Sequence, residues 1–321
     1  MENTHRLKRT KNLILLTREA QLGVNDLIYP MFIVESQRPN EALPGLPYYT
    51  LETALRACEE ACKLGILGAM IFDIVDTKGD KGMVALNEDL FTAKIFRTLK
   101  KEFGSDLLLI SNSGICSYRK DGSCIDYDSW GKPLIEETCS MIGRIAAAHA
   151  DYGADIVGLP EMVDGQVRHA RGSLDAAGFS DLPIMSLVKG DSCLFGPYEK
   201  AMRKEKNPTA SFTFRIDPSN RKMFKRKIDL EVLEGVDIIT IKPASLYLDI
   251  VQFAHDGYSL PVGAFQVSGE YVMLKSLGDG TQTGAAGVVI ESLQCMKRAG
   301  ASMIITYCAM EAARVLRGEG M

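Results

Sequence analysis

Histidine is scarce in this sequence. The chain of 321 residues has only four, at positions 5, 149, 169 and 255, and none of them falls in a predicted strand end. This distribution argues against a histidine-based catalytic triad and against a histidine-rich metal site. An excess of basic residues is also absent, because 37 Lys and Arg face 41 Asp and Glu and the sequence pI is near 5.7. With its basic residues scattered, the chain has no stripe for a polyanion, and we expect no nucleic-acid partner.

Long apolar runs are missing as well. The N-terminal stretch has a basic start, but its only apolar run is "LILL", which is too short for a signal-peptide core or a membrane span. The overall content of 46% hydrophobic and 24% charged residues is ordinary for a globular protein. We therefore expect a cytoplasmic protein that has no membrane partner.

The cysteines lack the spacing of a disulfide framework. Eight of them are dispersed along the chain, which is typical of reduced thiols in a reducing compartment. Most of them should behave as small buried apolar side chains. They occupy positions 58, 62, 116, 124, 139, 193, 295 and 308.

Eight short apolar stretches recur between amphipathic segments. Near-continuous apolar runs without alternation suit strands that are buried on both faces, as in a parallel sheet. Between the first two, Leu51, Leu55, Cys58 and Cys62 recur at helical spacing, and Gly65 can end that helix. Eight such units favour an α/β fold of the (β/α)8 barrel type over an open doubly wound sheet. The apolar stretches cover 26–33, 68–75, 106–111, 154–160, 182–188, 237–244, 261–268 and 302–309.

We expect a single barrel domain over 26–321, since no linker or low-complexity tract marks a second domain. In such barrels the chemistry lies at the C-terminal ends of the strands. Lys189 ends the fifth predicted strand and Lys242 lies in the sixth, so both should face one pocket.

Lys242 is flanked by Ile241 and Pro243. Poor solvation and a second ammonium nearby would lower its pKa and make it a nucleophile able to form a Schiff base with a ketone. The alternative is that each lysine extends to solvent or pairs with a carboxylate, because structural ion pairs also perturb pKa values.

The segment 110–124, "ISNSGICSYRKDGSC", holds Cys116 and Cys124 in a loop after the third predicted strand. Two cysteines are too few for a tetrahedral zinc site, which needs four ligands, or three and an exchangeable position. The spacing leaves open a metal site, the remnant of one, or an ordinary loop.

From about residue 5 to 317, the sequence resembles the porphobilinogen synthase family, also called 5-aminolevulinate dehydratase. The resemblance implies the eight-stranded barrel and a condensation of two 5-aminolevulinate molecules, with loss of two waters, to form a pyrrole. It rests on "HRLKRTKNLILLTREAQLGVNDLIYPMFIVE", "MVDGQVRHARGSLDAAGF", "IKPASLYLDIV", "GAFQVSGEY" and "SLQCMKRAGA".

The resemblance also implies roles for four residues. Lys242 would hold the first substrate as a Schiff base, and Lys189 would hold the second. Ser268 and Tyr307 fall where the family binds the carboxylate of the first substrate.

The loop with the two cysteines departs from the family pattern. Zinc-dependent members have three cysteines here, whereas this chain has Gly114 at the first position and keeps only Cys116 and Cys124. Asn112 stands where an Asp is usual. We therefore expect zinc to bind weakly at most, unless Cys193 supplies a replacement ligand.

The residues expected to bind the second substrate also depart from the family pattern. Glu199 and Ser211 stand where two arginines usually bind a carboxylate, although Arg215 is near enough in sequence to compensate. Phe195 replaces a usual tyrosine, and Tyr198 is expected to line the same pocket.

We therefore expect a lyase that activates 5-aminolevulinate, or a close 4-oxo acid, on Lys242 and has an altered second substrate or product. One alternative is an ordinary porphobilinogen synthase of tetrapyrrole synthesis with a relaxed metal requirement. Another is a catalytically silent paralogue, against which the retention of both lysines argues. The resemblance also implies a short N-terminal arm, which we expect over 1–25, and a homo-oligomer, either a dimer or a higher assembly.

Overall fold

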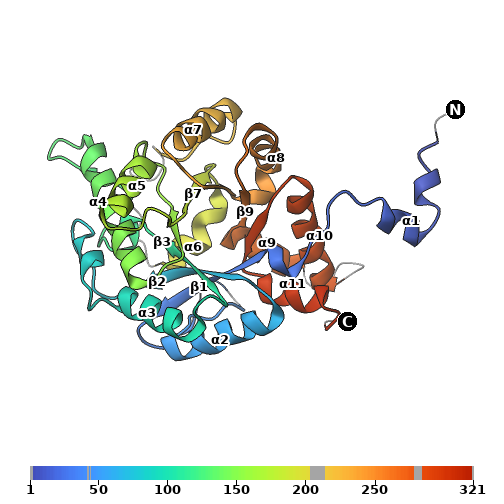
Figure 1. Cartoon of the computed structure of the whole chain (residues 1–321), viewed down its shortest axis with the longest axis horizontal. Helices are drawn as coiled ribbons and strands as arrows, with labels where there is room; N and C mark the ends of the chain where they lie inside the picture. Colours follow the sequence, from blue (N-terminus) through green and yellow to red (C-terminus); the bar gives the residue numbers. More distant parts are fainter. Residues whose placement is uncertain (1–2, 42, 44, 203–213, 278–283, 320–321) are drawn as a thin grey trace.

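The computed structural model describes residues 3–41, 43, 45–202, 214–277 and 284–319. Its centre is a closed barrel of eight parallel strands in the order β1-β10-β9-β8-β7-β6-β3-β2, surrounded by helices (Figure 1). Each of the eight predicted apolar stretches contains one of these strands, except for at most one residue at the C-terminal end of the strand, so the predicted barrel is confirmed. The strands are β1 (Leu27–Val34), β2 (Gly68–Ile74), β3 (Leu108–Asn112), β6 (Ile156–Leu159), β7 (Ile184–Lys189), β8 (Ile238–Lys242), β9 (Val262–Gln266) and β10 (Met303–Thr306).

The predicted helix between the first two strands is α2 (Leu51–Leu64). The hydroxyl of Thr50 accepts the backbone N–H of Thr53 at its start, and Gly65 ends it with a left-handed φ of 86° that glycine adopts without strain. The remaining helices are α1 (Lys11–Leu16), α3 (Phe91–Phe103), α4 (Ile135–Tyr152), α5 (Gln166–Ala176), α6 (Gly196–Ala201), α7 (Arg221–Leu233), α8 (Leu248–Gly257), α9 (Ser268–Leu277), α10 (Gly284–Arg298) and α11 (Ala309–Leu316).

Short elements fill several connections of the barrel. An antiparallel hairpin of β4 (Asp126–Tyr127) and β5 (Pro133–Leu134), which was not predicted from the sequence, lies between β3 and α4. The 3-10 helices are η1 (Arg6–Lys8), η2 (Val24–Asp26), η3 (Met83–Leu86), η4 (Ile115–Ser117), η5 (Cys193–Phe195) and η6 (Ala244–Leu246).

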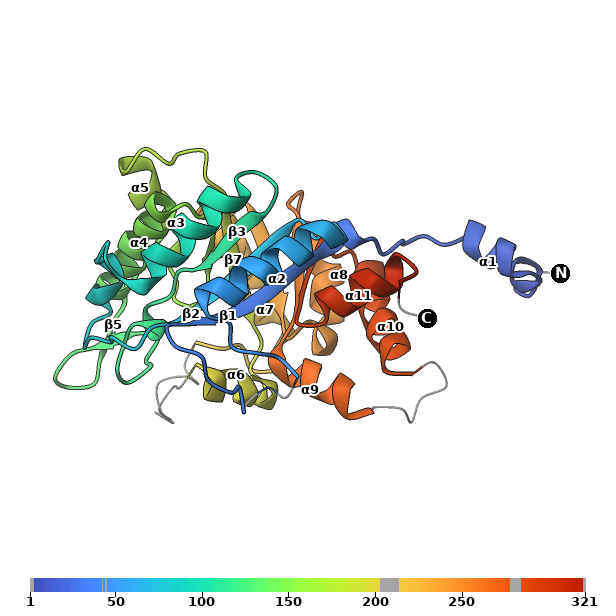
Figure 2. The same ribbon diagram turned by 90° about the horizontal axis from the view of Figure 1, so that it is seen from below.

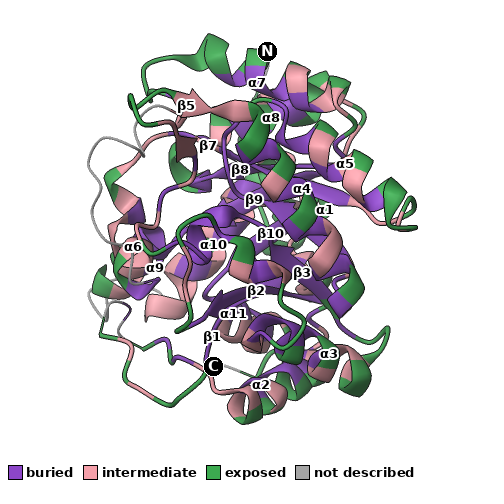
Figure 3. Ribbon diagram, turned by 90° about the vertical axis from the view of Figure 1, so that its left-hand side faces the viewer, coloured by how far each residue is buried: buried purple, intermediate pink, exposed green. Residues whose placement is uncertain are grey.

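The barrel strands form the core of the molecule. Every residue of β1, β2, β6, β8 and β9 is buried, as expected of strands covered on both faces. Figure 3 shows this buried centre, with helices whose exposed residues face outward. An aromatic group fills one region of the core, since the ring centroid of Phe32 lies 5.5 Å from that of Phe72 and 5.6 Å from that of Tyr307.

The N-terminal segment extends away from the barrel. It carries η1, α1 and η2, and Figure 2 shows α1 well outside the barrel. Helix α1 has no buried residue. Over the part of the chain that the structure describes, no helix combines the length and apolar character that crossing a bilayer would require.

Candidate active site

Lys189 and Lys242 end two neighbouring strands and are register partners across β7 and β8. The backbone N–H of Gly190 donates to the carbonyl of Lys242 over 3.0 Å, which fixes this register. Register partners on parallel strands project to the same side of a sheet, so the two amines share one end of the barrel. Lys242 is buried, and its Nζ lies 5.2 Å from the ring centroid of Phe265, whereas Lys189 is half-buried.

Ser268 and Tyr307 are buried on the neighbouring strand ends after β9 and β10. Within the described residues, the hydroxyl oxygen of Ser268 has no hydrogen-bond partner, which is unusual for a fully buried polar group. Burial raises the pKa of Tyr307 well above its ordinary value, so its hydroxyl keeps its proton and can donate. The pair can therefore offer two neutral donors to a carboxylate.

Glu270 supports this region from the first turn of α9. Its carboxylate accepts the backbone N–H groups of Ser245, at 2.7 Å, and of Val267, at 2.6 Å. Burial raises the pKa of Glu270 to about 7, although these hydrogen bonds act in the opposite direction. The carboxyl thus joins the loops that follow β8 and β9.

Arg215 lies in an ionic group with two carboxylates. It donates to Glu199 over 2.8 Å and to Asp191 over 3.4 Å, and its guanidinium lies 4.7 Å from the ring centroid of Phe195. Burial alone would lower the pKa of Arg215, but the surrounding groups, with Glu199 foremost and Asp191 among them, together outweigh burial and the pKa is raised. The structure thus brings Phe195, Glu199 and Arg215 together, while Ser211 lies outside the described residues.

Tyr198 belongs to α6, the helix that directly follows Phe195. Its ring centroid lies 5.5 Å from that of Phe72 and 6.2 Å from that of Phe32. Tyr198 therefore packs on the aromatic group of the core and connects α6 to the barrel.

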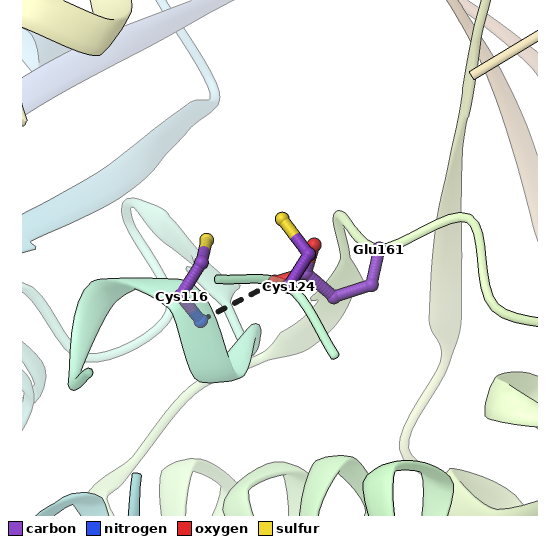
Figure 4. A group of neighbouring side chains, drawn as sticks. All are labelled: Cys116, Cys124 and Glu161. Atoms are coloured by element: carbon purple, nitrogen blue, oxygen red, sulfur yellow. Dashed lines mark hydrogen bonds between the residues drawn. The ribbon is translucent and has the colours of Figure 1, made fainter. Parts of the chain in front are cut away.

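Cys116 and Cys124 lie close to a third donor, Glu161, that was not predicted from the sequence. Their sulfurs and one carboxylate oxygen of Glu161 all lie within 4.8 Å of one another. Figure 4 shows Glu161 reaching from the loop after β6 to the two cysteines of the loop after β3. Two thiols and a carboxyl are donors that zinc accepts, so these residues fit the ion that the sequence suggested. Cys193 is exposed and does not belong to this group.

One feature of the sequence could have indicated Glu161. This residue directly follows the fourth predicted strand, and the cysteine loop directly follows the third. The carboxyl ends of parallel neighbours meet at one edge, and β3 does pair with β6.

A buried network holds the cysteine loop in place. The hydroxyl of Tyr118 donates to Asp73 over 2.9 Å and lies 2.9 Å from Nε2 of His149. Burial lowers the pKa of His149 to about 3, so the ring is neutral. Because Tyr118 has only one proton to donate, Nε2 of His149 donates to it, and Nδ1 accepts from the hydroxyl of Ser113 at 2.8 Å. The histidine therefore supports the loop and has no free nitrogen for a metal.

Comparisons with known proteins agree along the whole chain. A family model described as delta-aminolevulinic acid dehydratase matches residues 1–315. Relatives with that name include the protein of Halalkalibacterium halodurans, 34% identical over 98% of this chain and 96% of its own length. The Helicobacter pylori protein is 35% identical over 97% of this chain and 98% of its own length.

The fold also matches a solved structure from Toxoplasma gondii, with a TM-score of 0.94. That structure is of delta-aminolevulinic acid dehydratase (porphobilinogen synthase) in complex with the reaction product porphobilinogen. It is 30% identical to this chain, and the match covers 98% of this chain and 91% of that one.

Proposed function

Because the chain belongs to the delta-aminolevulinic acid dehydratase family, we propose that it is an ordinary porphobilinogen synthase, which joins two molecules of 5-aminolevulinate. The family is one of lyases, and the silent-paralogue alternative finds no support. The comparisons favour the ordinary reaction over an altered second substrate or product, because the relatives carry the dehydratase name and the Toxoplasma gondii enzyme binds porphobilinogen. The observation that carries the proposal is the register pairing of Lys189 with Lys242.

Each lysine would hold one substrate by its ketone. The neutral amine of Lys242 attacks the ketone carbon of the first 5-aminolevulinate, and loss of one water gives an imine. Lys189 would hold the second ketone in the same way. Release of both lysines as a carbon–carbon and a carbon–nitrogen bond form gives porphobilinogen, and the overall reaction loses two waters.

Hydrogen-bond donors would orient the two substrates. Ser268 and Tyr307 would donate to the carboxylate of the first, which supplies the partner that the buried Ser268 hydroxyl lacks among the described residues. Arg215 would pair with the carboxylate of the second, while Phe195 and Tyr198 cover the pocket and Glu199 orients the guanidinium.

Cys116, Cys124 and Glu161 would hold a zinc ion beside this pocket. Bound zinc would supply Lewis-acid polarisation of an oxygen or activation of a water.

The proposal extends to the arrangement of the chain. Residues 1–25 would form an arm used in a homo-oligomer, and 26–321 would form the catalytic barrel. The enzyme would act in the cytoplasm, in tetrapyrrole synthesis.

The test is to incubate the purified protein with 5-aminolevulinate alone and to identify products by mass spectrometry. We expect porphobilinogen at an enzymatic rate, on the order of 1 per second or faster. Borohydride added during turnover should attach substrate mass to the peptide that contains Lys242. Lys242→Ala should abolish both signals, because the first imine can no longer form.

Lys101→Ala is the matched control, since Lys101 is an exposed lysine on α3, outside the proposed site. It should change neither signal. An adduct on Lys242 without porphobilinogen would restore the altered-substrate interpretation. The absence of both an adduct and porphobilinogen would overturn the proposed reaction.

A further inference from the structure

Gly114 makes room for the carboxylate of Glu161. A Cβ atom at position 114 would lie 2.5 Å from Oε1 of Glu161 and 2.6 Å from Cγ of Pro160. Both separations are far below van der Waals contact. A side chain at position 114 would therefore require Glu161 and Pro160 to shift, and the Glu161 carboxylate occupies the space in which a third cysteine would begin.

Glu161 is held at this position by its surroundings. Its side chain is fully buried, and the backbone N–H of Cys116 donates to Oε1 over 3.4 Å. The same oxygen is thus next to Gly114 and next to the residue that supplies one of the thiols. The Glu161 side chain reaches the cysteine loop because β6, which precedes it, pairs with β3.

We infer that Glu161 replaces the missing third thiolate, so that Cys116, Cys124 and Glu161 together bind one zinc ion. Two thiolates and one carboxylate carry three negative charges, the same as three thiolates. Two sulfurs bound to a tetrahedral zinc lie about 3.8 Å apart, given bonds of about 2.3 Å. The present separations, all within 4.8 Å, therefore need only a small contraction.

Three protein ligands leave the fourth zinc position open, as in catalytic zinc sites. Zinc is favoured over magnesium or calcium because two of the three donors are soft sulfurs. The expectation of weak zinc binding assumed that no third donor was present, and Glu161 supplies one without Cys193. The inference rests on the zinc site of the proposed function and specifies its third ligand. Metal binding is measured without substrate, so a failure of this inference is distinguishable from a failure of the proposed reaction.

The experiment uses full-length protein that is stripped of metal and then titrated with Zn2+ and, separately, Co2+. We expect one metal per chain by elemental analysis, and a Co2+ spectrum with thiolate charge-transfer bands and intense tetrahedral ligand-field bands. Glu161→Gln should lower the affinity roughly 100-fold or more, since loss of an outer-shell partner alone costs 10- to 100-fold. The Co2+ ligand-field bands of Glu161→Gln should also differ from those of the wild type.

Gly114→Ala is the decisive variant, because it removes no donor atom. Its methyl group would push the Glu161 carboxylate aside, so the metal affinity should fall as in Glu161→Gln. Gly172→Ala is the matched control, since its Cβ would meet no atom within 4 Å and its backbone is helical. Cys193→Ser should also keep the wild-type affinity and spectrum.

Wild-type affinity and spectrum in Glu161→Gln, or in Gly114→Ala, would overturn the inference, as would loss of metal in Cys193→Ser. Near-ultraviolet circular dichroism checks that each variant is folded. If Glu161→Gln does not fold, Glu161→Asp takes its place, because it keeps the charge but shortens the reach by one methylene. If Glu161→Asp has the metal affinity and the Co2+ spectrum of the wild type, this result would equally count against Glu161 as a ligand.

Discussion

Arg215 is a cation shared between two carboxylates, in the region where we propose that the second substrate binds. Together with Glu199 and Asp191 it forms a group of net charge −1. In the proposed reaction the second substrate brings another carboxylate to this guanidinium. Glu199 therefore both orients Arg215 and competes with the substrate for it.

Glu199→Gln should lower the KM for 5-aminolevulinate severalfold, because the neutral amide no longer repels the substrate carboxylate. The free energy of unfolding should fall by less than about 1 kcal/mol, as for other partly exposed ion pairs. Steady-state kinetics and urea denaturation measure the two effects. Glu136→Gln, which removes one exposed partner of Arg168, should leave KM unchanged. A higher KM in Glu199→Gln would show that orientation outweighs competition.

The residues of the site differed in how far sequence could predict them. The placement of Lys189 and Lys242 at neighbouring strand ends was predictable, because a lysine at the end of an apolar strand is easily recognised in the sequence. The sequence also singled out Cys116 and Cys124, but not Glu161. Its proximity to them depends on the absence of a side chain at Gly114, which becomes informative only when the two loops are seen together.

Helix α9 is tied to the loop after β8 by Glu270. The carboxyl spans the backbone N–H groups of Ser245 and Val267, and Ser268 follows directly in the chain. Its folded-state pKa of about 7 lies above the ordinary value of 4.5. The Glu270 carboxyl group therefore binds its proton more tightly in the folded protein than in the unfolded chain.

The stabilisation from Glu270 should be complete below pH 4.5 and should be lost as the pH rises through about 7. The free energy of unfolding should fall by up to about 3 kcal/mol across this interval. Glu270→Gln cannot ionise, so this part of the pH dependence should disappear. Urea denaturation at pH 5 and pH 8 measures the pH dependence of the free energy of unfolding. Glu102→Gln is the control, because Glu102 is exposed. An unchanged pH dependence in Glu270→Gln would assign the effect to another group.

The elements were more predictable than their connections. Strands buried on both faces appear as continuous apolar runs, and all eight were predicted from that property. The hairpin β4–β5 has two residues in each strand, too few for any periodicity. Its pairing depends on the surrounding loop, which sequence patterns do not describe.

The whole molecule leaves apolar side chains exposed on its arm. Leu16 is 82% exposed, and Leu7, Ile14 and Leu15 are also exposed. A cluster of exposed apolar residues on one segment is typical of a surface that meets a partner. A second copy of the chain is the partner that the proposed homo-oligomer supplies.

Replacement of Ile14, Leu15 and Leu16 by serine should reduce the assembly to a smaller species, because the arm loses its apolar contacts. Light scattering coupled to size-exclusion chromatography measures the mass. Leu233→Ser is the control, since Leu233 is 84% exposed but lies on the barrel helix α7. The same mass for the triple variant and the wild type would show that the arm is not part of the interface.

The backbone hydrogen bond between Gly190 and Lys242 has a kinetic consequence. It fixes β7 against β8, and neighbouring strands lie about 4.8 Å apart, so the attachment points of the two proposed imines are set by the sheet. Two tethered reactants at such a spacing behave as if each were present at a very high effective concentration, which can supply roughly 7 to 11 kcal/mol of the barrier reduction. A substitution that moved one strand relative to the other would then slow bond formation while both substrates still bound.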